Sequence, residues 1–319
     1  MLKDHYIFSL SIIIPHRSAS AAATNGLSLS YFIRCGRGGL GNKLLIFLNV
    51  LDLLYCVSMT VSVGLNFVAL SRSNEDFIRY QAIYLKSSAI KYMFEEGTGF
   101  ATLLLSVTRC ISMYNPFYRI RTRPIVIASL VFFLYLLAKN SAFIFCFERS
   151  QCQQWNSHDN LEMQIGCEMM IIIVVVLISN VIAVSKLRGP PRNLGQERET
   201  SNRQITLTVF TLSAVFCCLN AFKYSVVLAV RLSTDFPFET VDNLAKYVAI
   251  PLNSALNPVI YTVRTRSMRQ YALDLLSCSG KRPRGSGSYP LEIIGSTHSR
   301  ANVVQWQVSN GANGTNIGT

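Results

Sequence analysis

Six long apolar stretches constrain this chain more than any other feature. They cover residues 44–70, 80–114, 124–147, 169–185, 204–230 and roughly 241–263. A transmembrane helix needs roughly 20 apolar residues, and these stretches are about that long or longer. Charged residues make up only 15% of the chain, against roughly 25% in an ordinary soluble domain. The sequence therefore predicts an all-α membrane protein.

The amino end has two interpretations. Residues 6–14 are apolar, Pro15-His16-Arg17 interrupts them, and residues 19–33 are apolar again, so the segment resembles either a cleavable signal peptide or a degenerate first helix. Basic residues follow residue 33 and recur at 119–123 and 186–198, and cytoplasmic segments are enriched in Lys and Arg. If these segments and the tail are cytoplasmic, a span must precede the second helix. We therefore expect a degenerate first helix over residues 6–33, an extracellular amino terminus and a cytoplasmic carboxyl terminus.

A short amphipathic helix is expected after the last span. Val263, Met268, Tyr271, Leu275 and Leu276 recur at helical spacing among several arginines, a pattern typical of a helix lying on the inner leaflet. Cys278 follows it and is either a palmitoylation site or a free thiol. Residues 1–279 are expected to form the bundle, and the Gly/Ser/Asn-rich residues 280–319 a disordered cytoplasmic tail.

Asp52 is the only charge in the first long stretch. A carboxylate at that depth in a membrane costs roughly 2.5–3.5 kcal/mol, so it needs partners. The candidates are polar residues of two other spans: Thr98, Asn253, Ser254 and Asn257. Either a protonated Asp52 is hydrogen-bonded within a structural network, or the group forms a polar cluster that binds a sodium ion.

An Asn257-Pro258 pair lies near the end of the last span, and Tyr261 follows one turn later. Proline lacks an N–H, so it leaves a backbone carbonyl one turn earlier without its helical partner. In a membrane that carbonyl must find another donor, such as a nearby Asn side chain or a water. We therefore expect a polar network at this proline.

Asn25, Asp52, Arg109 and Asn257-Pro258-x-x-Tyr261 occur in an order that resembles the rhodopsin-like (class A) G protein-coupled receptors, from about residue 25 to residue 278. An invertebrate chemosensory or peptide-receptor branch is the nearest resemblance. It implies a bundle of seven transmembrane helices in the plasma membrane, an extracellular ligand and a heterotrimeric G protein as partner. It also implies that Arg109 contacts the G protein or locks the inactive state, that Asp52 is the sodium-linked aspartate, and that Tyr261 moves inward on activation.

The chain departs from the family's pattern near Arg109 and in the sixth span. The acid that usually precedes the arginine is Thr108, and Glu199 is a possible substitute. We therefore expect a higher basal signal than in a Thr108→Asp variant. In the sixth span, Asn220 replaces the family's tryptophan and Phe222 its proline, which predicts a straighter helix.

The expected ligand cavity gives exclusions rather than an identity. The position of the opsin lysine is Pro251, which argues against a retinal Schiff base, and the position of the amine-receptor aspartate is Lys91. Lys91 and Glu95 are four residues apart and could neutralise each other. The candidate cavity residues are Lys91, Glu95, Asn220 and Lys246. Because Lys91, Lys139, Lys223 and Lys246 outnumber Glu95 and Glu96, an anionic ligand group is expected.

Nine cysteines show no metal-site spacing. Cys152 and Cys167 flank a segment expected outside the membrane, so they form either a disulfide or two free thiols. The net charge of +13 is concentrated at the ends of apolar stretches, which argues against a nucleic-acid partner. HExxH, GxSxG and phosphate-loop motifs are missing, so we expect no enzyme, and no cofactor beyond the sodium ion.

Two rival interpretations remain. A small secondary transporter would use Asp52, Lys91 and Glu95 as an ion or proton relay, although the inverted repeats typical of transporters are not visible. A defective or truncated receptor-like protein would explain the damaged first helix and the altered sixth span.

Overall fold

The structure is a computed structural model that describes residues 19–34, 40–70, 74–114, 122–148, 158–187, 196–232 and 245–276. At some positions in these ranges, Glu199 and Lys246 among them, it describes the backbone only. The described part is helical throughout and contains no strand. After a helix over residues 19–34 come α2 (Leu40–Leu70), α3 (Asn74–Tyr114), α4 (Thr122–Glu148), α5 (His158–Leu187), α6 (Gln196–Leu232), the π-helix η2 (Ala245–Ala249), α8 (Ile250–Arg264) and α9 (Arg266–Leu276).

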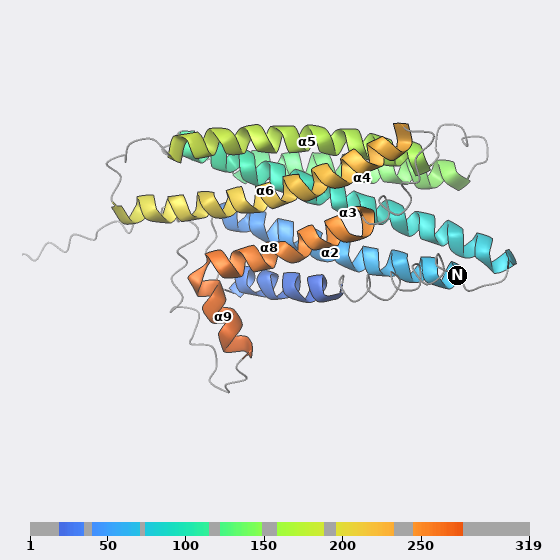
Figure 1. The fold of residues 1–319 in the computed structure, drawn as a ribbon, viewed down its shortest axis with the longest axis horizontal. Helices are drawn as coiled ribbons and strands as arrows, with labels where there is room; N and C mark the ends of the chain where they lie inside the picture. Colours follow the sequence, from blue (N-terminus) through green and yellow to red (C-terminus); the bar gives the residue numbers. More distant parts are fainter. Residues whose placement is uncertain are drawn as a thin grey trace, which may run out of the picture.

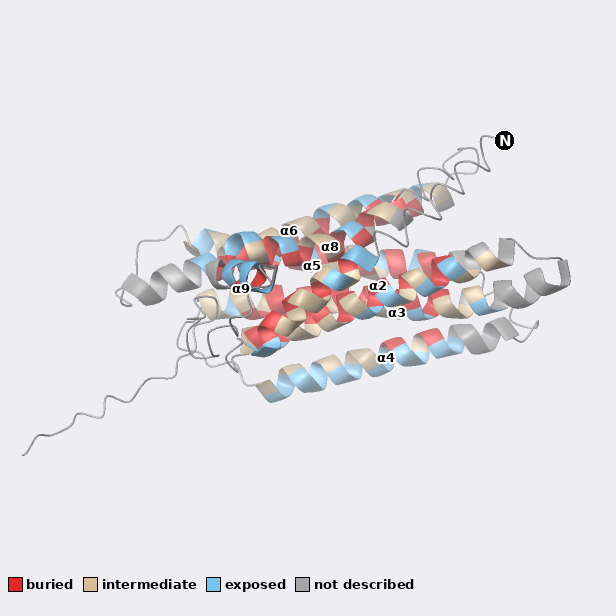
Figure 2. Cartoon of the chain, turned by 90° about the horizontal axis from the view of Figure 1, so that it is seen from below, coloured by how far each residue is buried: buried red, intermediate tan, exposed pale blue. Residues whose placement is uncertain are grey.

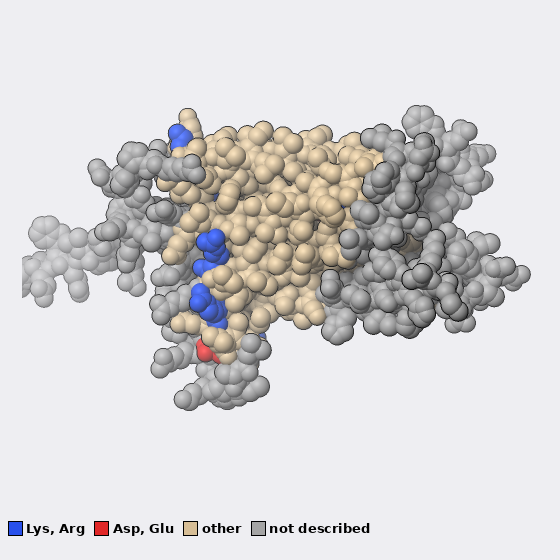
Figure 3. All heavy atoms as spheres, in the orientation of Figure 1, with Lys and Arg blue, Asp and Glu red and all other residues tan. Residues whose placement is uncertain are grey.

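Four of the described helices are long and apolar enough to cross a membrane. The apolar segments are Leu40–Leu65 in α2, Thr122–Ala142 in α4, Leu161–Leu187 in α5 and Gln204–Val230 in α6. Figure 3 shows a broad face whose described middle carries no charged side chain, with Lys and Arg at the end where α8 meets α9. The predicted all-α membrane class is supported at this level.

The long helices lie side by side, and α3 contacts α2, α4, α5 and α6 (Figure 1). Half of the apolar segments of α2 and α6 is buried, but only 11% of that of α4, which lies at the edge of the bundle (Figure 2). In a membrane the exposed apolar side chains of α4 would face lipid, where they cost nothing. Because α3 is surrounded, its polar side chains have partners on several helices.

The second half of the predicted first helix is helical. Residues 19–34 pack against the carboxyl-terminal helices: Tyr31 and Phe32 are fully buried, and the Phe32 ring lies 5.2 Å from that of Tyr261. The Ser30 hydroxyl hydrogen-bonds the Tyr271 hydroxyl of α9 at 2.9 Å. Residues 6–18 lie outside the described residues, so the choice between a signal peptide and a degenerate helix stays open.

The predicted amphipathic helix corresponds to α9, which turns away from α8 (Figure 1). The apolar residues of the predicted helix divide into buried and exposed positions. Met268 and Tyr271 are buried against the bundle, whereas Val263 and Leu275 are exposed. The bundle therefore covers Met268 and Tyr271, and the side chain of Leu276 lies outside the described residues.

Two other expectations need correction at α5 and α6. α5 begins at His158, eleven residues before the predicted start, so Glu162, Cys167 and Glu168 belong to a helix rather than to an outer loop. α6 runs without a break from Gln196 to Leu232, as the replacement of proline by Phe222 predicts.

Candidate functional site: a buried polar core

Asp52 is fully buried at the centre of the described bundle. Asn257 Nδ2 donates to its Oδ2 at 2.7 Å, and the hydroxyls of Ser254 and Thr98 donate to its Oδ1 at 3.1 and 3.4 Å. Three of the four predicted partners therefore reach Asp52, from α3 and α8. The donors satisfy the carboxylate where water and lipid cannot.

Asn253, the fourth predicted partner, makes no described bond to Asp52. Its side chain is 2% exposed, and its Oδ1 has no hydrogen-bond partner. Asn253 lines a small cavity, together with Asn220 of α6 and Glu95 of α3. Asn220 is buried as well and donates to the Phe216 carbonyl at 2.9 Å, which occupies one of its two N–H donors.

Pro258 frees the carbonyl of Ser254, four residues earlier in α8. Asn25 Nδ2, from the helix over residues 19–34, donates to that carbonyl at 3.0 Å. Asn25 is fully buried and also donates to the Ala21 carbonyl at 2.9 Å. The expected donor for the freed carbonyl is thus an Asn side chain from another helix. Ser254 connects Asn25 to Asp52, because its carbonyl accepts from Asn25 and its hydroxyl donates to Asp52.

Arg109 lies near the carboxyl end of α3, half-buried, and no described residue pairs with it. Thr108, at the position of the usual acid, donates instead to the Leu105 carbonyl at 3.0 Å. Glu199, the suggested substitute, has a side chain outside the described residues. Tyr261 is 1% exposed, and its hydroxyl lacks a hydrogen-bond partner.

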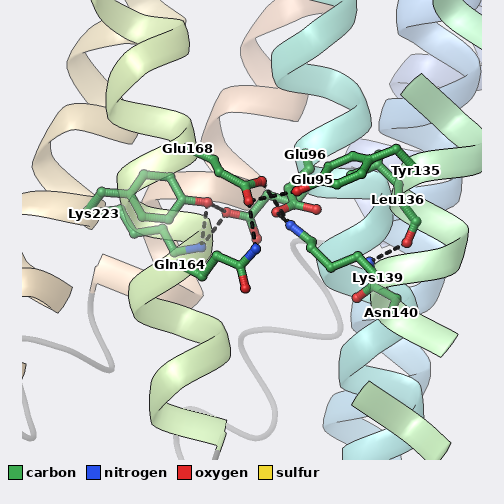
Figure 4. A network of polar contacts seen from close by, with 10 residues as sticks. Glu95, Glu96, Tyr135, Leu136, Lys139, Asn140, Gln164, Glu168 and Lys223 are labelled. Atoms are coloured by element: carbon green, nitrogen blue, oxygen red, sulfur yellow. Dashed lines mark hydrogen bonds and ion pairs between the residues drawn. The ribbon is translucent and has the colours of Figure 1, made fainter. Parts of the chain in front are cut away.

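A second polar cluster joins α3, α4 and α5. Lys139 of α4 forms ion pairs with Glu96 of α3 and with Glu168 of α5, the latter at 2.9 Å (Figure 4). Glu168 also accepts hydrogen bonds from Tyr135 and Gln164, each at 2.9 Å. Because α5 was expected to begin after Glu168, sequence patterns offered no reason to place this carboxylate beside Lys139.

Next to Glu96, Glu95 faces α6 instead. Lys223 and the Tyr224 hydroxyl both donate to Glu95 Oε1 (Figure 4). The side chains of Glu95 and Lys223 are 3% and 4% exposed, so the ion pair is shielded from solvent. Such a pair fixes α3 against α6, and removing one partner strands a buried charge.

The acids near the expected ligand cavity are more numerous than the sequence analysis assumed. Glu162 accepts a hydrogen bond from Tyr92 and is buried, so Glu162 and Glu168 join Glu95 and Glu96 in this region. Even with Lys246, whose side chain lies outside the described residues, the four lysines no longer outnumber the acids. Lys91 is 8% exposed, and its ammonium lies 4.4 Å from the centre of the Tyr92 ring. The expectation of an anionic ligand group therefore loses its support from the charge count and stays a prediction.

Two predictions concern three cysteines, of which the structure describes Cys167. Cys167 is exposed on α5 and carries a free thiol. The free thiol at Cys167 favours the alternative of two free thiols over a bridge to Cys152. Cys152 and Cys278 lie outside the described residues, so the acylation of Cys278 stays a prediction. Residues 280–319, the predicted tail, also lie outside.

The residues around Asp52 have the donor chemistry that a sodium ion prefers. The Asp52 carboxylate, the hydroxyls of Thr98 and Ser254 and the unpaired Oδ1 of Asn253 are all oxygen donors. Hard monovalent and divalent cations are bound in proteins by such oxygens. Asn257 contributes its N–H group to Asp52 and so supports the carboxylate rather than an ion.

No protein-family model matches this chain, and a search of curated proteins finds no match. The described geometry therefore defines a class only: an all-helical protein with four apolar, membrane-length helices and a buried polar core.

Proposed function

We propose that this protein is a rhodopsin-like G protein-coupled receptor. It would form seven transmembrane helices in the plasma membrane, with the amino terminus outside and the carboxyl terminus inside. An extracellular peptide or chemosensory small molecule would be its ligand, and a heterotrimeric G protein its partner. The observation that carries the proposal is a set of hydrogen bonds that ties Asp52 to α8 beside Pro258. Asn257 and the Ser254 hydroxyl donate to Asp52, and Asn25 donates to the Ser254 carbonyl.

The linkage is suited to a conformational switch. Hydrogen bonds in a low-dielectric interior are strong and directional, so a polar core that can be rearranged has discrete states. A ligand that binds one arrangement better shifts the population toward it. Tyr261, with its buried and unpartnered hydroxyl, is the side chain best placed to gain a partner in a second arrangement.

Arg109 would be the contact with the G protein. Its position at one end of α3, near the end of the bundle where α8 meets α9, puts it on the same side as the Lys and Arg side chains of Figure 3. Those cations support a cytoplasmic location for this end. Without an acid at position 108, Arg109 has no adjacent carboxylate to restrain it, so we propose basal activity.

A sodium ion would bind the Asp52 carboxylate with the oxygens of Thr98, Ser254 and Asn253. Bound there, it would supply the positive charge that Asp52 lacks among its described partners. The hydrogen bonds from Thr98, Ser254 and Asn257 to Asp52 hold α2, α3 and α8 together.

The test is a measurement of ligand-independent coupling in cells. Wild type and Arg109→Ala, matched for surface expression, are compared across a panel of G protein subtypes. The proposal expects a basal signal for at least one subtype that Arg109→Ala abolishes. Surface-expressed wild type with no signal for any subtype, alone and with a ligand library, would refute it and favour a defective receptor.

A secondary transporter is the second candidate, and the buried Glu–Lys–Tyr cluster favours it. Glu95, Glu96, Lys139, Lys223 and Tyr224 are buried titratable groups paired across three helices, and a proton relay is built from such groups. Substrate uptake driven by a proton gradient, without coupling to a G protein, would select this candidate.

A further inference from the structure

An apolar stripe of exposed side chains runs along one face of α8. It consists of Leu252, Val259 and Val263, which are 41%, 49% and 64% exposed, while Ile260 and Tyr261 pack into the core. Spacings of seven and four residues place the three on the same face of a helix. At 1.5 Å per residue the stripe is about 16 Å long, close to the roughly 15 Å of hydrocarbon in one leaflet of a bilayer. One acyl chain can therefore lie along all of it.

Two exposed arginines lie where this stripe ends. Arg264 is the last residue of α8 and follows Val263 directly, and its Nη2 donates to Thr211 Oγ1 of α6 at 3.2 Å. Arg269 of α9 donates through its own Nη2 to the Val263 carbonyl at 3.1 Å. These bonds hold both guanidinium groups at the corner between α8 and α9.

Both guanidinium groups keep donors for a further partner. A guanidinium has five N–H donors and is always charged, and each of the two bonds above uses only one donor. Neither Arg264 nor Arg269 forms an ion pair with a described residue. Two positive charges at one corner repel each other, and an anion between them removes that repulsion. Arginine binds phosphate groups through two parallel hydrogen bonds, so a phosphate fits this corner.

The whole end of the bundle at this corner has an excess of positive charge. The helix over residues 19–34, α5 and α8 end there, and α2 and α4 begin there (Figure 1). The described and exposed charged side chains at these helix ends and on α9 are one acid, Asp274, and six cations: Arg34, Lys43, Arg123, Lys186, Arg264 and Arg269.

These cations lie at the level of lipid headgroups. Lys43, Arg123 and Lys186 each lie within one helical turn of the end of a membrane-length apolar segment. Figure 3 shows the Lys and Arg side chains beyond the uncharged middle of the apolar face. Basic residues at this level attract anionic lipids of the adjacent leaflet.

We propose that the corner of α8 and α9 binds one anionic phospholipid, with its phosphate on Arg264 and Arg269 and an acyl chain along Leu252, Val259 and Val263. The apolar stripe favours a lipid, because a free anion or an acidic protein would satisfy the arginines and leave the stripe uncovered. Through Arg264 and its bond to Thr211, the phosphate would connect α6, α8 and α9. The binding itself needs no G protein.

The test is thermal unfolding of the purified full-length protein in dodecyl maltoside, with dioctanoyl-phosphatidylglycerol as the probe. Dioctanoyl-phosphatidylcholine is the neutral control with the same chains, sodium phosphate tests a free anion, and poly-glutamate tests an acidic protein. We expect a saturable rise in the unfolding temperature with phosphatidylglycerol only. An equal rise with any of the three other probes would overturn the proposal, since it would assign the corner to apolar contact alone, to a free anion or to an acidic protein.

Variants locate the site. Arg264→Gln and Arg269→Gln should each raise the half-saturating mole fraction of phosphatidylglycerol by ~5-fold, the factor that one cation near a membrane surface contributes. Arg123→Gln is the matched control, because Arg123 is an exposed arginine at the same end of the bundle but on α4, which packs on α3. It should leave the half-saturating mole fraction unchanged. An equal rise in Arg123→Gln, or no rise in the other two variants, would overturn the proposal.

A measurement on the wild type covers the case in which the variants do not fold. In native mass spectrometry from a mixture of the two lipids, the protein should retain one phosphatidylglycerol and release phosphatidylcholine. Equal retention of both lipids, or of neither, would overturn the site. A chain that retains phosphatidylglycerol but never couples to a G protein would refute the receptor function alone, and the reverse result would refute the lipid site alone.

Discussion

The bond from Asn25 to the Ser254 carbonyl should depend on Pro258. Asn25 Nδ2 lies 3.0 Å from a carbonyl that has no helical donor because residue 258 is proline. In a Pro258→Ala background the new N–H can occupy that carbonyl, so losing Asn25 should matter less. The quantity to measure is therefore the coupling between Asn25→Leu and Pro258→Ala, not either single effect.

The magnitude follows from the geometry. Asn25 is fully buried, its bond is of normal length, and the interaction crosses two helices. Interhelical hydrogen bonds in membrane proteins contribute about 0.6 kcal/mol on average and up to about 1.7 kcal/mol. Because the Ser254 carbonyl would otherwise be buried without any donor, we expect a coupling of about 1–1.7 kcal/mol.

The assay is unfolding by SDS in lipid–detergent bicelles, followed by circular dichroism, for wild type, both single variants and the double variant. The matched control is Asn140→Leu in α4, a buried Asn that also donates to a backbone carbonyl, that of Leu136, at 2.9 Å. Its effect should add to that of Pro258→Ala without coupling. Additive effects for Asn25→Leu as well would refute the role assigned to the proline.

Three further predictions concern α3. Thr108→Asp places an acid beside Arg109 and should lower basal coupling by roughly 5-fold, since an exposed ion pair contributes up to about 1 kcal/mol. An equal basal signal from wild type and Thr108→Asp in a cell assay would contradict this. Lys223→Met should destabilise the protein by about 3–5 kcal/mol because it leaves the buried Glu95 carboxylate without its cation. The double variant Glu95→Leu/Lys223→Met removes both charges and should recover much of that loss in the same bicelle assay. Gly99→Val should cost about 1 kcal/mol, the low end of the overpacking range, because a Cβ at Gly99 would lie 2.8 Å from Met169 Cε, the end of a flexible side chain that can move. Gly26→Val, at a glycine with nothing within 4 Å, should be tolerated, and equal unfolding midpoints for the two variants would refute the packing argument.

The residues around Asp52 show how far sequence patterns reach. Asp52 interrupts an apolar stretch, so a partner was required, and Asn257 lies on a helix that the proline marks as polar. The partners of Glu95 and Lys139 were not predictable in the same way. A pair within one helix follows from a spacing of four residues, but a pair between helices depends on how each helix is rotated and shifted along its axis. Lys223 lies 128 positions from Glu95, and the sequence contains no signal that links them.

The ends of the helices show the same limit. Hydropathy located the apolar segments because burial in lipid requires them, but it began α5 too late, since Glu162 and Glu168 are charged. Paired charges are tolerated inside a bundle where single ones are not. The partners that make these glutamates tolerable, Tyr92 and Lys139, come from other helices.

The sequence by itself determined that the chain is helical, that long segments of it are apolar enough to cross a membrane, and that Asp52 and the proline of α8 need polar partners. Each of these follows from local chemistry: backbone hydrogen bonding in lipid, the desolvation of a charge, and the missing N–H of proline. Only the tertiary structure decided that Asn25 satisfies the Ser254 carbonyl, that Glu95 and Glu96 turn toward different helices, and that two arginines are held at the corner of α8 and α9. These arrangements depend on helix rotation and register, which are set by packing over the whole bundle rather than by any one segment.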